Sequence, residues 1–97
     1  MQPSDVFDEF LREFERAERK FPTFPKDIIH AAAIVSEEAG ELVRAANQVT
    51  YEKGHYVDVM KEAVQTGAMA LRFILNFCHF EERPSEQIRR ENKVVNE

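Results

Sequence analysis

Hydrophobic residues recur every three or four positions along most of the chain. This spacing is typical of amphipathic α-helices, and no useful length of sequence alternates apolar and polar residues as a half-buried strand does. The pattern predicts three long helices at about residues 4–19, 26–50 and 56–80, followed by a short helix at about 84–95. We therefore expect an all-α fold without a sheet.

Proline and glycine separate the predicted helices. Pro22 and Pro25 lie in the stretch FPTFP and end the first helix, because proline lacks an N–H and its ring clashes with the preceding helical turn. Gly54 is the predicted turn residue between the second and third helices. Ser4 is the candidate N-cap of the first helix, and Pro84 suits the first turn of the last one.

The length of the chain limits its core. Its 97 residues are enough for a single domain, 1–97. A chain of this size buries only about 60–65% of the surface that it exposes when unfolded. The third predicted helix is apolar on almost every side, so it needs neighbours on both sides. We therefore expect a helical bundle completed by oligomerisation into a four-helix-type core, as a homodimer or a dimer of dimers.

Charge and composition exclude several classes of partner. The formal net charge of −5 is spread along the chain without a basic block, which argues against binding to a nucleic acid polymer. No apolar run reaches the roughly 18 residues of a membrane span, and the first ten residues do not resemble a signal peptide. The single cysteine, Cys78, has apolar neighbours that predict a buried thiol. We expect a cytoplasmic protein without a membrane partner.

Acidic residues lie where the long helices should be apolar. At about 100° per residue, Glu38 projects into the apolar stripe of the second helix, close to Ile34. Glu41 lies about 60° to one side and one turn along. Glu62 falls in line with Met69 in the apolar stripe of the third helix. Three polar residues flank the same edge of the third helix: Asp58, Gln65 and Asn76.

Burying several unpaired carboxylates costs several kcal/mol, because each is desolvated and like charges repel. One interpretation is that Arg44, Lys61 or Arg72 pairs with them, although these residues project about 80–120° away from the glutamates. Another is that basic side chains of a second subunit pair with them. The third is a divalent cation, and carboxylates without histidine or cysteine favour Mg²⁺ or Mn²⁺ over zinc. Periodicity alone leaves these interpretations open.

The acidic stretch resembles a known family. The sequence EEAGE at 37–41 is similar to the EExxE signature of the MazG-like all-α nucleoside triphosphate pyrophosphohydrolases. The second motif of that family is ExxD on the following helix, and EAVQ at 62–65 matches its first residue. Glutamine stands here in place of the aspartate. The resemblance covers the second and third predicted helices, 26–80, about half of the chain.

The resemblance implies a helical bundle completed as a dimer or tetramer. It implies a magnesium-dependent enzyme that cleaves nucleoside triphosphates between the α and β phosphates, giving a monophosphate and pyrophosphate. Glu38, Glu41 and Glu62 would be the metal ligands, and Mn²⁺ could replace Mg²⁺. Glu37 would lie beside the metal and help to orient water, so the catalytic residues expected from the resemblance are Glu37 and Glu38.

Gln65 departs from the family pattern. It offers one neutral oxygen where the family supplies an anion, which should weaken Mg²⁺ binding or remove one ion of a pair. Gln65 could coordinate through its amide oxygen, or Asp58, one turn before Glu62, could reach the ion as a substitute. The alternative function is a non-catalytic helical oligomer whose degenerate metal site serves a binding or regulatory module.

Three further residues are candidates for contact with the nucleotide substrate. Phe21 and Phe24 lie in the proline-rich connection and are expected to contact the base, and Asn76 is expected to hydrogen-bond the substrate. The phenylalanines of the first helix are expected to be core instead, because they recur at helical spacing: Phe7, Phe10 and Phe14.

Overall fold

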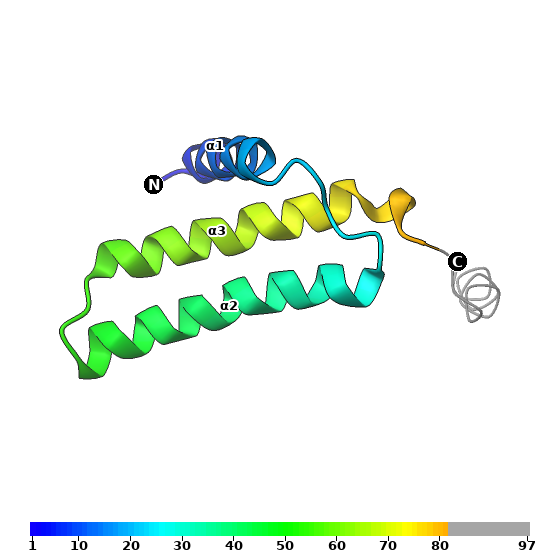
Figure 1. The fold of residues 1–97 in the computed structure, drawn as a ribbon. Helices are drawn as coiled ribbons and strands as arrows, with labels where there is room; N and C mark the ends of the chain where they lie inside the picture. Colours follow the sequence, from blue (N-terminus) through cyan, green and yellow to red (C-terminus); the bar gives the residue numbers. More distant parts are fainter. Residues whose placement is uncertain (82–97) are drawn as a thin grey trace, which may run out of the picture.

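The computed structural model describes residues 1–81, and all regular structure in this part is helical (Figure 1). The elements are α1 (Pro3–Lys20), α2 (Ile28–Tyr51), α3 (Tyr56–Leu75) and a single 3₁₀ turn, η1 (Phe77–His79). The prediction of an all-α fold is confirmed, since residues 1–81 contain no strand. The fourth helix predicted at about 84–95 lies outside the described residues.

The second and third helices form an antiparallel hairpin, and the first helix runs across it (Figure 1). Within the described part of the chain, α3 packs against both α2 and α1, whereas no Cα atom of α1 lies within 8 Å of a Cα atom of α2. The third helix is therefore the centre of the fold, as expected from a helix that is apolar on almost every side.

The first helix begins one residue before its predicted start. Gln2, not Ser4, is the N-cap residue, and Pro3 occupies the first helical position, where the missing N–H is not needed. The Asp5 carboxylate accepts a hydrogen bond of 2.9 Å from the Gln2 backbone N–H, and the Gln2 carbonyl accepts one of 3.0 Å from the Asp5 N–H. The predicted N-cap was wrong because this exchange between Gln2 and Asp5 caps the helix instead.

The second helix begins after Asp27, whose carboxylate accepts a hydrogen bond of 3.2 Å from the Ile29 N–H. Gly54 lies in the connection to α3, as predicted. Its N–H donates to the Gln48 carbonyl over 3.1 Å, and a Cβ at position 54 would lie only 2.8 Å from the Gln48 backbone carbon. The chain can turn back this closely because residue 54 has no side chain.

The third helix ends at Leu75, before the predicted end near residue 80. The side-chain amide of Asn76 donates to the Arg72 carbonyl over 2.8 Å and so satisfies a backbone group at the end of the helix. Beyond η1, the Glu81 N–H donates to the Lys26 carbonyl over 2.8 Å. This bond ties the end of the described chain to the start of α2.

A glycine sets the distance between α1 and α3. A Cβ at position 67 would lie 2.6 Å from the Phe10 ring, so the ring occupies a notch that only glycine leaves open. Phe10 and Phe14 are half-buried, in line with their predicted role in packing. Phe7 is 61% exposed in the single chain, so its assignment to the core was wrong there.

The buried core of the described chain is made of small side chains. The buried apolar residues are all alanines: Ala17, Ala31, Ala45 and Ala68. Cys78 is exposed, so the prediction of a buried thiol was wrong for the single chain. Each of the three helices also presents large apolar side chains of which more than half is exposed: Phe7, Ile29, Val43, Val57 and Ile74. None of the helices within residues 1–81 combines the length and the apolar character of a membrane span.

Candidate functional site

Three glutamates meet across the hairpin. Glu38 and Glu41 come from α2 and Glu62 from α3, and each offers a carboxylate oxygen such that all three oxygens lie within 4.8 Å of one another. Glu38 and Glu62 are half-buried, whereas Glu41 is exposed. We call these three residues the glutamate cluster. Their apposition follows from helical periodicity, which placed the acids on the facing sides of two helices that pack together.

No member of the glutamate cluster forms a direct ion pair with another residue of 1–81. One oxygen of Glu38 and one of Glu62, Oε2 in each, are buried and accept no hydrogen bond in this part of the chain. The ion pairs between described residues join α1 residues to one another or α1 to α3, and none includes a member of the cluster. The cluster is therefore not held by direct ion pairs with cations of its own helices, although the positive charge of Lys61 favours the ionised form of Glu62.

The pKa values of Glu38 and Glu62 also reflect the crowding of negative charge in the cluster. Burial raises the pKa of Glu38, and the negative charges of Glu41 and Glu62 raise it further. Burial also raises the pKa of Glu62, with repulsion from Glu41 as the next cause. Both shifts mean that the folded protein disfavours the charged carboxylates. A bound cation would reverse that preference.

The two alternative fourth ligands lie beside different members of the cluster. Asp58 shares a hollow of about 280 Å³ with Glu41 and Glu62, but its carboxylate is not among the three that converge. Gln65 lines a smaller hollow of about 200 Å³ together with Glu38. Asp58 and Gln65 therefore both lie near the cluster, and the role of each as a fourth ligand stays a prediction.

Glu37 is exposed and lies outside the three converging carboxylates. Its negative charge contributes, as the smallest of the causes, to the raised pKa of Glu38. A position in solvent next to a cluster member is compatible with orienting a water molecule. The catalytic role expected for Glu37 stays a prediction.

The first helix also contributes to the site, which sequence reasoning missed. Glu13 and Arg16 line the same hollow as Glu38, and the charge of Glu13 helps to raise the pKa of Glu38. Arg16 is held by Glu13 through hydrogen bonds of 2.6–3.1 Å. A signal was present, because Glu13 stands three residues after Phe10 and four before Ala17, on the packed face of the helix.

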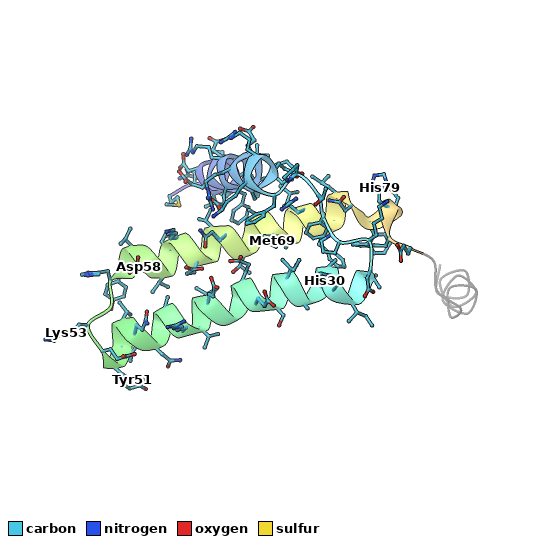
Figure 2. All side chains as sticks on the ribbon, viewed as in Figure 1. His30, Tyr51, Lys53, Asp58, Met69 and His79 are labelled. Carbon is cyan, nitrogen blue, oxygen red and sulfur yellow. The ribbon has the colours of Figure 1, made fainter. Side chains whose placement is uncertain are left out.

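A cavity of about 600 Å³ adjoins the cluster. It lies between the 21–27 connection, α2 and α3, and Glu38 is part of its lining. Figure 2 labels two other lining residues, His30 on α2 and Met69 on α3. Phe21 and Phe24, the expected base contacts, also line this cavity. We call it the loop cavity.

Asn76, the third expected substrate contact, is not part of the lining of the loop cavity. Its amide donates within the end of α3, as described above. The structure therefore gathers two of the three expected substrate residues near Glu38 and places the third at a helix end.

Arg72 links three segments beside the loop cavity. Its guanidinium donates to the Glu18 carboxylate over 3.0 Å and to the Phe21 carbonyl over 2.7 Å. It also lies over the Phe24 ring, 5.0 Å from the ring centroid. Local spacing could not predict the pair with Glu18, because the two residues are brought together only by the crossing of α1 and α3.

Comparison with protein-family profiles gave no match, and neither the curated proteins nor the solved structures contain one that matches this chain. The resemblance to the MazG-like family therefore depends on the residues at 37–41 and 62–65.

Proposed function

We propose that this protein is a magnesium-dependent pyrophosphohydrolase that cleaves nucleoside triphosphates between the α and β phosphates. One observation carries the proposal: Glu38, Glu41 and Glu62 present carboxylate oxygens within 4.8 Å of one another, and two of these side chains each have a buried oxygen without a hydrogen-bond partner in residues 1–81. The EExxE resemblance is the basis for the proposed reaction, and the three converging carboxylates support the proposal that a cation takes part in it.

The donor set fits Mg²⁺ or Mn²⁺. All three converging groups are carboxylates, and hard oxygen donors without imidazole or thiolate suit these ions. A divalent ion, when bound, neutralises phosphate charge and activates water. Glu38, Glu41 and Glu62 hold the ion in this proposal. Glu37, exposed beside Glu38, orients the attacking water.

The loop cavity supports a nucleotide substrate. Glu38 lines it together with Phe21 and Phe24, so the phosphate-binding and base-binding ends of one ligand can share a continuous space. We assign the base to the two phenylalanines, because aromatic rings stack on the face of any nucleobase.

We further propose that the functional unit is a homodimer or a dimer of dimers. The buried apolar residues of the described chain are alanines, and large apolar side chains on all three helices are more than half exposed. A second copy would cover this surface and complete a four-helix core.

Gln65 favours a second candidate function. Because glutamine lacks the charge of the family aspartate, the site could bind a cation or nucleotide without turning it over. The protein would then be a non-catalytic helical oligomer that acts as a binding or regulatory module.

A pyrophosphate-release assay separates the two candidates. The panel comprises the ribo- and deoxyribonucleoside triphosphates, each with Mg²⁺ or Mn²⁺ and with EDTA. We expect metal-dependent release of pyrophosphate and monophosphate from at least one nucleotide, loss of release in Glu38→Gln, and full release in Glu52→Gln, a control at an exposed glutamate at the end of α2. A wild-type protein that binds the metal and releases no pyrophosphate supports the non-catalytic module.

A further inference from the structure

Arg72 carries a hydrogen-bond donor without a partner. The residue is only 2% exposed, and its ion pair with Glu18 and its bond to the Phe21 carbonyl both use one terminal nitrogen, NH2. The Nε–H is buried and donates to no atom of residues 1–81. A buried donor on a charged group that lacks an acceptor is costly, more so than on a neutral group. An acceptor supplied by a ligand would remove that cost.

Arg72 is also part of the wall of the loop cavity. A volume of about 600 Å³ lies in the range of small-molecule sites, which combine apolar and aromatic walls with a few polar groups. Phe21 is 54% exposed, and the Phe24 ring already lies against the Arg72 guanidinium. The cavity therefore offers aromatic surface next to the Arg72 side chain.

The charges around the loop cavity argue against an anion at this end. The guanidinium of Arg72 is already paired with the Glu18 carboxylate, so its charge is largely compensated. An additional phosphate would also meet acids that outnumber the cations in the lining. The charged residues of the lining are two cations and three acids: Lys26, Arg72, Asp27, Glu38 and Glu81.

A neutral, planar group fits these conditions better. Aromatic walls favour a flat ring, and the Arg72 Nε–H requires an acceptor on the edge of that ring. Nucleobases combine both features, since each has a π-face and an edge with carbonyl oxygens or ring nitrogens.

We propose that Arg72 is a specificity-determining residue, whose Nε–H donates to a carbonyl oxygen or ring nitrogen of a nucleobase held against Phe21 and Phe24 in the loop cavity. The inference rests on the proposed function in so far as the base belongs to the substrate whose phosphates lie toward Glu38. It adds the recognition of an acceptor edge, which phenylalanine stacking alone does not provide.

Free nucleosides test the proposal without metal or hydrolysis. The full chain is titrated in EDTA with adenosine, guanosine, cytidine, uridine and thymidine, and with ribose as the control, while arginine Nε–H signals are followed in ¹H–¹⁵N spectra. We expect at least one nucleoside to shift the Arg72 Nε–H signal, and ribose to leave it unchanged. If every nucleoside leaves that signal in place, the proposal is overturned.

Variants provide a second test. Arg72→Lys keeps the positive charge and removes the Nε–H, so it should bind the selected nucleoside about tenfold more weakly, the loss expected for one hydrogen bond to a charged group. Arg19→Lys, at an exposed position of α1, should bind like the wild type. Equal affinity in a folded Arg72→Lys variant overturns the proposal. If this variant does not fold, the Arg72 signal is assigned through its proximity to the Phe24 ring protons, and the titration decides.

The outcomes distinguish this proposal from the proposed function. Metal-dependent pyrophosphate release, without a nucleoside-induced shift of the Arg72 Nε–H signal, would support the proposed enzyme and overturn the proposed base-recognition site. A nucleoside-induced shift of the Arg72 Nε–H signal, without pyrophosphate release, would support the base-recognition site and overturn the proposed enzymatic activity.

Discussion

Replacing Glu38 with glutamine should stabilise the metal-free protein at neutral pH. The cluster oxygens lie within 4.8 Å of one another, so each pair of charges repels by about 1 kcal/mol at the dielectric constant of water and by about 3.5 kcal/mol at an effective value of 20. Glu41 is exposed, and solvent screens its contribution toward the lower figure. We therefore expect a gain of about 1–3 kcal/mol in the free energy of unfolding for Glu38→Gln in EDTA at pH 7.

The pH dependence fixes the sign of this effect. The pKa of Glu38 in the folded protein is raised above its ordinary value of 4.5, so the folded state holds a proton that the unfolded state has already released. The wild type therefore loses stability as the pH rises from the unfolded value through the folded one. The advantage of Glu38→Gln should be small below about pH 4.5 and should grow with pH until it levels off above the folded pKa.

Urea unfolding at one fixed protein concentration, followed by circular dichroism in EDTA, measures the difference. Glu52→Gln removes an exposed charge outside the cluster and should change stability by less than about 0.5 kcal/mol. A Glu38→Gln variant that is less stable than the wild type at pH 7, or a difference that is the same at pH 4 and pH 7, would refute this account of the cluster.

The remaining predictions concern packing, the fourth ligand and assembly. Gly67→Ala places a Cβ 2.6 Å from the Phe10 ring and should lower the free energy of unfolding, measured in urea, by about 1–3 kcal/mol. Gly40→Ala, where a Cβ would have no atom within 4 Å, should be neutral or stabilising. Equal effects of the two substitutions would contradict the close packing of Phe10 on Gly67. Gln65→Asp should raise Mg²⁺ affinity and pyrophosphate release together. If Asp58 is the substitute ligand, Asp58→Asn should weaken Mg²⁺ binding more than Gln65→Ala does; no effect from either change would show that the site is misplaced. Light scattering after size exclusion should give a dimer or tetramer at micromolar concentration, and a folded monomer of 11.3 kDa would contradict the proposed assembly.

The parts of the structure that depend on local periodicity could be predicted from the sequence. The three long helices and the approach of Glu38 to Glu62 follow from the angle between successive residues and from the antiparallel packing of two neighbouring helices. Gly54 was recognisable because a short connection with one glycine is a common way to reverse a helical chain.

Features that depend on competing local bonds could not be predicted in this way. The apolar pattern continues past Leu75, but the Asn76 amide caps α3, and the Phe73, Phe77 and Phe80 rings pack together with centroids 5.0–6.4 Å apart instead of extending the helix. A helical wheel shows only the directions of side chains, so it cannot predict that a side-chain amide ends the helix.

Features that bring distant segments of the chain together were also beyond the sequence. The Arg72–Glu18 ion pair and the loop cavity both require segments that are distant in the chain to meet. The helical wheel predicted that Arg72 projects away from the glutamates, but it could not identify Glu18 and the Phe21 carbonyl as the partners of the guanidinium.

Calorimetric titration with Mg²⁺ and with Mn²⁺ tests the central claim most directly, because it asks whether Glu38, Glu41 and Glu62 form one cation site. The account predicts saturable binding to the wild type and to Glu52→Gln, and no detectable binding to Glu38→Gln under the same conditions. Equal binding of both ions to the wild type and to Glu38→Gln would contradict it.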